Sequence, residues 1–270
     1  MNEHGIRDLE SILISLGLNS NSNILCHSSL MHLGKLKNID IVDYPKKILE
    51  VFSKILANTG TLIVPSSNFD YGIKKVTHNI DNSPVSKSLG SFSNYVTFHS
   101  SSYRSLNPIF ALSAIGKNSK DICLQSNALA FGEGSAWDIL FTYKPKILYL
   151  GCGFEYTTFI RFIEFKYGVP YLYNKLFTTS VVRDNEKIDY SVIAPLRYHH
   201  LNDQTVYNLS KFEQYLIEKK ILIVKKFGET KIMLIDMHEC FDEGIKCLEK
   251  DLHYFLAKKP SYNETEYPLY

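Results

Sequence analysis

The fold is decided by residues 132–164, which read GEGSAWDILFTYKPKILYLGCGFEYTTFIRFIE. This stretch holds, in order, a glycine-rich loop, a short helix, a buried strand, a glycine turn and an apolar helix. Residues 147–150 are expected to form the strand, because a short apolar run there stops at the glycine turn 151–153. Thr157 or Thr158 can cap the free N–H groups of the helix that follows. The succession of strand, turn and buried helix predicts an α/β fold.

A polar stripe interrupts the otherwise apolar surface of that helix. Thr158, Arg161 and Glu164 follow one another at intervals of three residues, which favours one side of a helix. A mostly buried helix must satisfy such a stripe with hydrogen-bonding or charged partners. The stripe is therefore either an internal Arg–Glu pair that fixes packing or the floor of a ligand-binding cleft, and the pattern alone leaves both interpretations open.

Composition limits the classes of function. The 270 residues are 45% hydrophobic and 21% charged, with a net charge of +2, as in an ordinary water-soluble domain. Neither nucleic-acid binding nor membrane binding is indicated by this charge, and no apolar run reaches membrane-span length. The five cysteines are scattered and lack metal-site or redox-motif spacing, so we expect reduced thiols, no bound metal and a cytoplasmic location. The N-terminus lacks signal-peptide character.

Along the chain, helical and strand patterns alternate, and residues 1–258 are expected to form one domain followed by a tail at 259–270. Residues 72–108 read as a long polar excursion that contains one short helix. A hairpin is expected from strands 180–182 and 188–194. The other expected helices are 6–17, 43–57, 91–99, 121–129, 207–219 and 241–257, and the other expected strands are 24–26, 61–65, 109–115, 221–224 and 231–235.

Polar residues follow two of the predicted strands. His27, Ser28, Ser29 and Leu30 come after strand 24–26, where free backbone N–H groups and hydroxyls can hold an anion or the polar arm of a cofactor. The alternative is an ordinary serine cap of a helix. Ser66 and Asn68 follow strand 61–65, and in α/β sheets such positions often line the site.

The turn 147–153, ILYLGCG, also resembles the glycine turn of nucleotide-dependent methyltransferases. Tyr149 stands where that class usually has an acidic residue, and Phe154-Glu155 replaces a later glycine. A cofactor turn also normally opens a βαβ series, whereas this one lies past the middle of the chain. Methyltransferase activity is therefore kept as a minor alternative.

Six motifs in order resemble the aminoglycoside 3-N-acetyltransferase family, in particular a branch associated with amino sugars of surface polysaccharides. The resemblance covers about residues 8–257 and implies a single-domain mixed sheet flanked by helices. The matching segments are 16–34 (LGLNSNSNILCHSSLMHLG), 60–68 (GTLIVPSSN), 104–116 (RSLNPIFALSAIG), 131–140 (FGEGSAWDIL), 148–164 (LYLGCGFEYTTFIRFIE) and 169–175 (VPYLYNK).

The resemblance implies transfer of an acyl group from coenzyme A to an amine. It assigns catalysis to Glu164 with Arg161 and Thr158. The cofactor-binding residues that it implies are His27, Ser28, Ser29, Leu30, Gly132, Gly134 and Ser135. The substrate-binding residues that it implies are Ser66, Asn68, Asn94, Arg104 and Asn107.

Three of these positions depart from the family pattern. Arg161 stands where the family has a histidine that acts with the glutamate, and an arginine cannot accept a proton near neutral pH. Asn107 and Asn94 stand where acidic residues, or in the first case also histidine, are common. Arg161 is expected either to neutralise Glu164 or to bind an anion on the substrate. Spare candidates for a base are His27, His78, His99, His199 and His200.

We therefore predict that the protein N-acylates an amino sugar used as a glycan precursor, and not an aminoglycoside. One form of this hypothesis has the amino sugar linked to a nucleotide. Aminoglycosides are polycationic and call for acidic clefts, whereas this chain is near neutral and has asparagines at positions 94 and 107. A family member that binds ligand without turnover is the first alternative. A homodimer is a further expectation.

Overall fold

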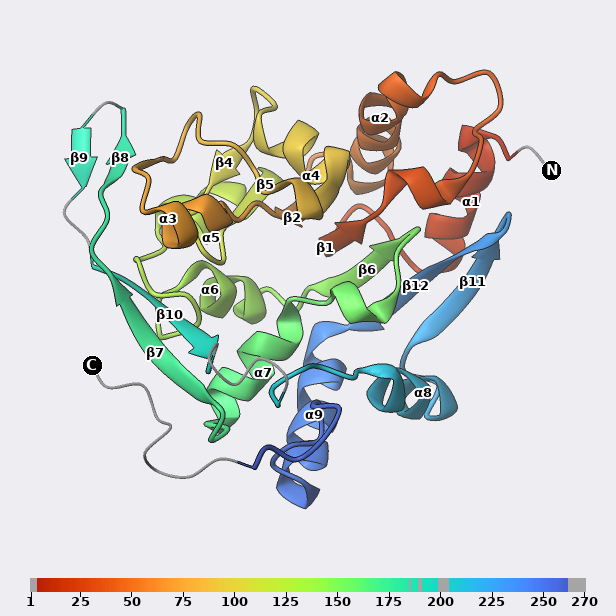
Figure 1. Ribbon diagram of the computed structural model, residues 1–270. Coiled ribbons are helices and arrows are strands. Elements are labelled where there is room, and N and C mark those ends of the chain that lie inside the picture. The colour runs from red at the N-terminus through yellow and green to blue at the C-terminus, as the bar shows by residue number, and fades with distance from the viewer. Residues whose placement is uncertain (1–3, 185, 189–190, 199–203, 262–270) are drawn as a thin grey trace.

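The computed structural model describes residues 4–184, 186–188, 191–198 and 204–261. Its centre is a seven-stranded mixed sheet (Figure 1). Strands β6, β1 and β2 are parallel to one another, and β12 and β5 flank them in antiparallel orientation. In spatial order the sheet contains β11 (Ile223–Phe227), β12 (Thr230–Asp236), β6 (Lys146–Leu150), β1 (Asn23–Ser28), β2 (Thr61–Pro65), β5 (Leu112–Gly116) and β4 (Tyr103–Arg104).

Helices cover both faces of this sheet, in three layers (Figure 1). Successive side chains of β6 enter opposite cores: Leu148 and Leu150 join the core under α1, α2 and α4, whereas Ile147 and Tyr149 join the core with α5, α6, α7 and α9. Both faces are buried, which explains why the central strands read as continuous apolar runs. The helices are α1 (Ile6–Ser15), α2 (Tyr44–Leu56), α3 (Phe69–Lys74), α4 (Gly90–Thr97), α5 (Ser119–Leu124), α6 (Ala136–Thr142), α7 (Phe159–Tyr167), α8 (Ser210–Glu218) and α9 (Met237–Lys250).

Two smaller sheets extend from the main body at the edge where β8 and β9 are labelled (Figure 1). Strand β10 (Val192–Arg197) pairs antiparallel with β7 (Leu172–Phe177). The other sheet has the order β3 (His78–Asn79), β8 (Val181–Arg183) and β9 (Glu186–Ile188). Short 3₁₀ segments complete the described elements: Leu30–Leu33, Ile41–Asp43, Lys87–Leu89 and Phe154–Tyr156.

The α/β fold, the mixed sheet and the flanking helices are confirmed. The expected hairpin is wrong in its second strand, because β8 pairs with β9 and the following strand β10 pairs instead with β7, which the sequence did not predict. The threonine cap is also wrong: Thr158 occupies the N-cap of α7, but its side chain makes no capping hydrogen bond. The last helix begins at Met237 and ends at Lys250, so the predicted range 241–257 lies too far along the chain.

Within the described ranges, no helix combines the length and apolarity needed to cross a bilayer. Most of the predicted tail, residues 262–270, lies outside the described residues.

Candidate active site

A cavity of about 620 Å³ lies beyond the carboxyl ends of β2 and β6. This is the edge of an α/β sheet where ligands usually bind. One wall comes from the segment after β2, a second from the turn and first residues of α7, and a third from β7, β10 and the chain before α8. The lining includes the apolar side chains Phe69, Ile73, Leu89, Ile109, Phe110, Tyr156, Ile160, Phe177, Leu196 and Leu209.

Positive charge predominates in this cavity. Among the described residues, Arg161, Lys175 and Arg197 line it, against one carboxylate, that of Glu155. Arg161 comes from α7, and the other two come from the paired strands β7 and β10. The cavity can therefore bind an anionic group beside a largely apolar wall.

The polar stripe of α7 divides between the cavity and the interior. Thr158 and Arg161 line the cavity, but Glu164 has 0% exposure and is not among the lining residues. Its carboxylate accepts hydrogen bonds from two tyrosines: Tyr171 Oη donates to Oε1 at 2.6 Å, and Tyr207 Oη donates to Oε2. Tyr207 itself lines the cavity, so Glu164 reaches the cavity wall through one hydroxyl group.

Two guanidinium groups flank Tyr207. The Cζ atom of Arg161 lies 4.4 Å from the centroid of the Tyr207 ring, and that of Arg197 lies 4.5 Å from it. Both distances fall within the range of cation–π contacts. Arg197 Nη1 also donates to the carbonyl oxygen of Thr205, which fixes the side chain against the chain leading to Tyr207. Arg161, Arg197, Tyr207 and Glu164 thus form one cluster, which we call the arginine–tyrosine cluster.

Burial sets the proton affinities of this cluster. Burial raises the pKa of the Glu164 carboxyl above its usual range, while Arg161 and the hydrogen bonds from Tyr171 and Tyr207 oppose the rise. Burial and the adjacent Glu164 also raise the pKa of Tyr207 well above that of a free phenol. Burial lowers the pKa of Arg197, and Arg161 adds to this effect. A carboxylate with increased proton affinity therefore lies next to a protonated tyrosine.

The segment His27–Leu30 lies beside the cavity but does not line it. His27 and Leu30 are buried. Ser29 occupies the N-cap position of the 3₁₀ segment Leu30–Leu33, but its side chain makes no capping hydrogen bond, so the ordinary serine cap is wrong; the Ser29 hydroxyl lies 2.7 Å from His32 Nδ1 instead. His27 Nε2 and Ser28 Oγ have no hydrogen-bond partner among the described residues. A Cβ at Gly90, next to the lining residue Leu89, would lie 3.3 Å from the Ser28 carbonyl oxygen. Buried polar atoms that lack a partner among the described residues can take one from the polar arm of a cofactor.

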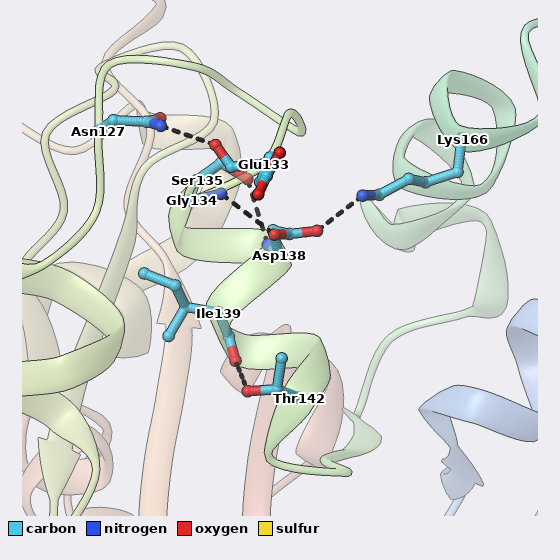
Figure 2. A network of polar contacts seen from close by, with 8 residues as sticks. All are labelled: Asn127, Glu133, Gly134, Ser135, Asp138, Ile139, Thr142 and Lys166. Atoms are coloured by element: carbon cyan, nitrogen blue, oxygen red, sulfur yellow. Dashed lines mark hydrogen bonds and ion pairs between the residues drawn. The ribbon is translucent and has the colours of Figure 1, made fainter.

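In the loop with Gly132, Gly134 and Ser135, the last two residues make hydrogen bonds with Asp138 in the first turn of α6, as Figure 2 shows. The Ser135 hydroxyl accepts a 3.2 Å hydrogen bond from the Asp138 N–H, and Asp138 Oδ2 accepts one from Gly134 N at 3.1 Å. Asp138 also pairs with Lys166 at 2.6 Å. Because the first turn of α6 already holds a carboxylate, the loop has a structural role here, and its contact with a cofactor stays a prediction.

The five predicted substrate-binding residues separate into three kinds of environment. Ser66 is fully buried, Asn68 Nδ2 contacts His78 Nδ1 at 3.3 Å, and neither residue lines the cavity, although the neighbouring Ser67 does. Arg104 donates from Nη1 to the Ser83 carbonyl at 2.6 Å and from Nη2 to the Ser66 carbonyl, and burial lowers its pKa to about 10.

Asn107 uses its whole amide group on the backbone. Its Nδ2 donates to the carbonyl oxygens of Ala128 and Ile193 at 2.7 and 3.2 Å, and its Oδ1 accepts from the N–H groups of Ile109 and Phe110, both at 3.0 Å. Asn94 is exposed on α4 and does not line the cavity. Asn107 thus supports the backbone of two residues that line the cavity, Ile109 and Phe110. Asn94 is not brought to the cavity.

Sequence reasoning missed Tyr207, Arg197 and Lys175. Tyr207 is 43 positions from its partner Glu164, and no local pattern marks it. Of the spare histidines, His27 and His78 are buried outside the lining, and burial lowers their pKa values to about 4 and about 3. His99 belongs to a second, smaller cavity of about 260 Å³. His199 and His200 lie outside the described residues.

Comparison with known proteins identifies a family. The family model described as aminoglycoside 3-N-acetyltransferase matches residues 25–249, most of the chain. A search of curated protein sequences found no match.

Solved structures show the same fold. The apoenzyme of aminoglycoside acetyltransferase AAC(3)-IVa superposes with a TM-score of 0.77 at 21% identity, over 96% of this chain and 93% of that one. AAC-IIIb, solved as a binary complex with CoASH, gives 0.76 at 17% identity, over 96% and 100% of the two chains. The YokD protein from Bacillus subtilis gives 0.72 at 18% identity, over 90% and 98%. At these identities the structures establish the fold, and the family model establishes the ancestry.

Proposed function

Because this chain belongs to the aminoglycoside 3-N-acetyltransferase family, we propose that it acylates the amine of an amino sugar that carries a negative charge. The enzyme class, a coenzyme A-dependent N-acyltransferase, follows from the family, and a relative has been solved with CoASH. The finer assignment of the acceptor is supported by one observation, the excess of arginine and lysine in the cavity wall. The methyltransferase alternative is set aside, since fold and family both point to acyl transfer.

The positive charge of the cavity favours an anionic acceptor over a polycationic one. An aminoglycoside carries several ammonium groups, and Arg161, Lys175 and Arg197 place the same sign of charge in the cavity wall. Like charges in one cavity disfavour binding unless acidic residues outnumber the basic ones, and in the described part of the wall Glu155 alone is acidic. A phosphate or carboxylate on the sugar reverses the sign of the interaction. A phosphorylated or nucleotide-linked amino sugar, the kind of precursor used for polysaccharides, has the required chemistry.

The donor is expected to lie between the segment His27–Leu30 and the cavity. His27 Nε2 and Ser28 Oγ are the unused polar atoms that would hold it. Coenzyme A supplies an acyl group activated as a thioester. Neither of the two buried atoms is committed elsewhere, and Ser28 lies against Gly90, next to the cavity wall. The two unpartnered side-chain atoms support the cofactor-binding role that the family resemblance gives to His27 and Ser28.

Within the cavity the residues of α7 have distinct tasks. The acceptor amine must lose a proton to attack, so a proton acceptor has to be reachable from the cavity. Glu164 has the increased proton affinity that this requires, and of its two hydroxyl partners among the described residues Tyr207 is the one that lines the cavity. Thr158 lies at the start of α7 with its hydroxyl available to orient the acceptor, and Arg161 is placed to bind the anionic group.

Thiol release from acetyl-coenzyme A tests the proposal. Three acceptors form the comparison: glucosamine 6-phosphate, glucosamine without the phosphate, and the aminoglycoside sisomicin. We expect the highest kcat/KM with the phosphorylated sugar. A preference for sisomicin would refute the charge argument, and binding of the phosphorylated sugar with no thiol release from any acyl donor would instead favour a member that has lost turnover.

The variant Lys175→Glu identifies which ligand the positive wall serves. Reversing this charge should raise the KM for the phosphorylated sugar by about tenfold, which corresponds to about 1.4 kcal/mol, and should leave the KM for acetyl-coenzyme A within about twofold. Lys117→Glu is the matched control, because Lys117 is exposed and outside the lining. An increase confined to the KM for acetyl-coenzyme A would assign the wall to the donor and overturn the acceptor assignment.

A cytoplasmic location is part of the proposal. All five cysteines are free thiols, and all are buried. Unpaired cysteines are usual in a reducing compartment, where acyl-coenzyme A is also made. The predicted homodimer stays a prediction.

A further inference from the structure

We propose that the Tyr207 hydroxyl group accepts the proton of the acceptor amine while it passes its own proton to Glu164. The inference rests on the proposed function, because it supplies the proton acceptor for that reaction. It assigns catalysis to a tyrosine from the chain before α8, and it changes the task of Glu164 from direct base to final proton acceptor.

The geometry leaves one route from the cavity to the buried carboxylate. Glu164 has 0% exposure, so an acceptor molecule in the cavity cannot touch it. Of its two hydroxyl partners, Tyr171 is also 0% exposed, whereas Tyr207 lines the cavity. Tyr207 therefore presents one side to the acceptor while its Oη donates to Glu164 Oε2. A proton can pass from cavity to carboxylate along these two bonded groups without any side-chain movement.

Three of the groups that line this part of the cavity are unsuited to accept a proton. The Arg161 guanidinium stays charged at all pH values that enzymes use, and the same holds for Arg197. Thr158 is a neutral hydroxyl for which no acidic partner is seen within the described residues. The carboxylate of Glu155 is exposed and lies outside the arginine–tyrosine cluster, in the 3₁₀ segment Phe154–Tyr156. Tyr207 alone among the described lining residues is hydrogen-bonded to a buried carboxylate.

The charges around Tyr207 favour a concerted transfer. Glu164 and burial oppose a free phenolate, while Arg161 and Arg197 lie over the ring and favour negative charge there. Tyr171 faces the same carboxylate from the other side, through its bond to Oε1. Because a free phenolate is disfavoured here, Tyr207 can give up its proton only while it accepts another one, and this exchange makes it a proton relay. The two guanidinium groups stabilise the charge as it shifts between Oη and the carboxylate.

The step balances as follows. The amine nitrogen forms a bond to the thioester carbonyl carbon, and its surplus proton moves to Tyr207 Oη as the Tyr207 proton moves to Glu164 Oε2. The carbon–sulfur bond breaks with its electron pair on sulfur. Return of the proton from Glu164 through Tyr207 to the sulfur gives the free thiol and restores both side chains. The products are one amide and one thiol, and no further reactant is needed.

Tyr207→Phe and Tyr171→Phe form a matched pair for the test. Each removes one hydroxyl bonded to the same carboxylate, but of the two residues only Tyr207 lines the cavity. With acetyl-coenzyme A and glucosamine 6-phosphate, Tyr207→Phe should lower kcat by about 10²- to 10⁴-fold with little change in the KM for the sugar. Tyr171→Phe should lower kcat by less than about tenfold. Equal losses would assign both hydroxyls to positioning Glu164 and overturn the relay.

A second readout does not depend on turnover. 3-Fluorotyrosine is placed at position 207 or, as the control, at 171, and the fluorine resonance is followed while glucosamine 6-phosphate is added without donor. We expect the resonance at 207 to shift and the one at 171 to stay. In the turnover assay, the label at 207 should also move the pH profile of kcat, which a merely structural tyrosine would not do.

The two readouts separate failure of the inference from failure of the proposed function. Normal turnover in Tyr207→Phe, or a resonance at 207 that does not respond to the sugar, overturns the relay. A resonance that shifts without any thiol release from the wild-type protein supports contact between Tyr207 and the acceptor and refutes the proposed reaction alone.

Discussion

Replacing Asn107 with alanine should destabilise the protein far more than the loss of one polar side chain at the surface. The Asn107 side chain is 3% exposed and bonds four backbone groups. Two of these groups keep another partner, since the Ile193 carbonyl also accepts from Ala130 N at 2.9 Å and the Ala128 carbonyl from Ile193 N at 3.4 Å. The N–H groups of Ile109 and Phe110 lose the partner that Asn107 provides.

The magnitude follows from those two N–H groups. A buried donor left without a partner costs about 1–3 kcal/mol, so two of them give a loss of about 2–6 kcal/mol in the free energy of unfolding. With a urea m value of about 3 kcal/mol per molar, a loss of 3 kcal/mol in this range lowers the midpoint by about 1 M. The single tryptophan is a convenient probe, because Trp137 Nε1 donates to the Phe110 carbonyl at 2.8 Å and so reports on the loop that Asn107 supports.

Asn94→Ala is the matched control for this experiment. It makes the same chemical change on the exposed side of α4, where the effect should stay within about 0.5 kcal/mol. Urea titrations followed by Trp137 fluorescence compare the two variants with the wild type. Equal midpoints for the two variants would refute the reasoning, and would return Asn107 to the substrate-binding role that the sequence suggested.

Three further predictions concern stability. Burial raises the pKa of Glu164, so its contribution to folding is present below the unfolded pKa of about 4.3 and is lost as the pH rises through the folded pKa. In urea titrations the stability of the wild type relative to Glu164→Gln should therefore fall as the pH rises above about 4, and a constant difference would contradict the shift. Burial lowers the pKa of His27 from 6.5 to about 4. The contribution of neutral His27 to the free energy of unfolding is therefore present above pH 6.5 and is lost as the pH falls toward 4, by up to about 3 kcal/mol. The variant His27→Phe should remove this part of the acid sensitivity. Gly151 has φ +68° and a Cβ there would lie 2.7 Å from the Ser29 carbonyl oxygen, whereas Gly168 has φ +83° with nothing within 4 Å. Gly151→Ala should therefore lower the thermal midpoint more than Gly168→Ala, whose cost is the backbone strain of about 1–2 kcal/mol alone, and the reverse order would show that the turn yields.

Much of the main body could be predicted because local pattern and burial agree there. The apolar runs at 24–26, 61–65 and 147–150 all became central strands, buried on both faces. The amphipathic pattern at 43–57 became α2, which presents Ile48, Phe52 and Leu56 to the core. These elements are determined by hydrophobic burial, and the sequence records which positions are buried.

The additional sheets could not be predicted for the opposite reason. Strand β7 reads LYNKLF, and its residues are half-buried or exposed except for Phe177. It pairs with β10, a strand some 15 to 25 residues further on, through the register of Leu172 with Arg197 and Phe177 with Val192. Backbone hydrogen bonds between such strands leave no hydrophobic signature, so pairing depends on where the rest of the fold places them.

The burial of Glu164 has a geometric origin. A helix turns by about 100° per residue, so two steps of three residues leave Glu164 about 120° away from Thr158 around α7. Thr158 and Arg161 can face the cavity, but a third residue at the same spacing rotates into the core. Each interpretation of the stripe therefore holds for part of it: Thr158 and Arg161 line the cavity, whereas Glu164 is an internal carboxylate.

That rotation explains why the arginine–tyrosine cluster has its composition. A carboxylate inside a core is costly unless hydrogen bonds and positive charge compensate it, and Glu164 has two hydroxyl donors with two guanidinium groups beyond them. One negative charge against two positive charges leaves a surplus, and the surplus lies in the cavity wall. The same arrangement that makes a buried Glu164 tolerable therefore gives the cavity its affinity for anions. A substitution that neutralises Arg161 or Arg197 should lower the free energy of unfolding, because Glu164 loses a compensating charge. The same substitution should weaken binding of the anionic acceptor, because the cavity wall loses positive charge. The two effects should appear together in these variants, whereas Lys175→Glu should show only the second.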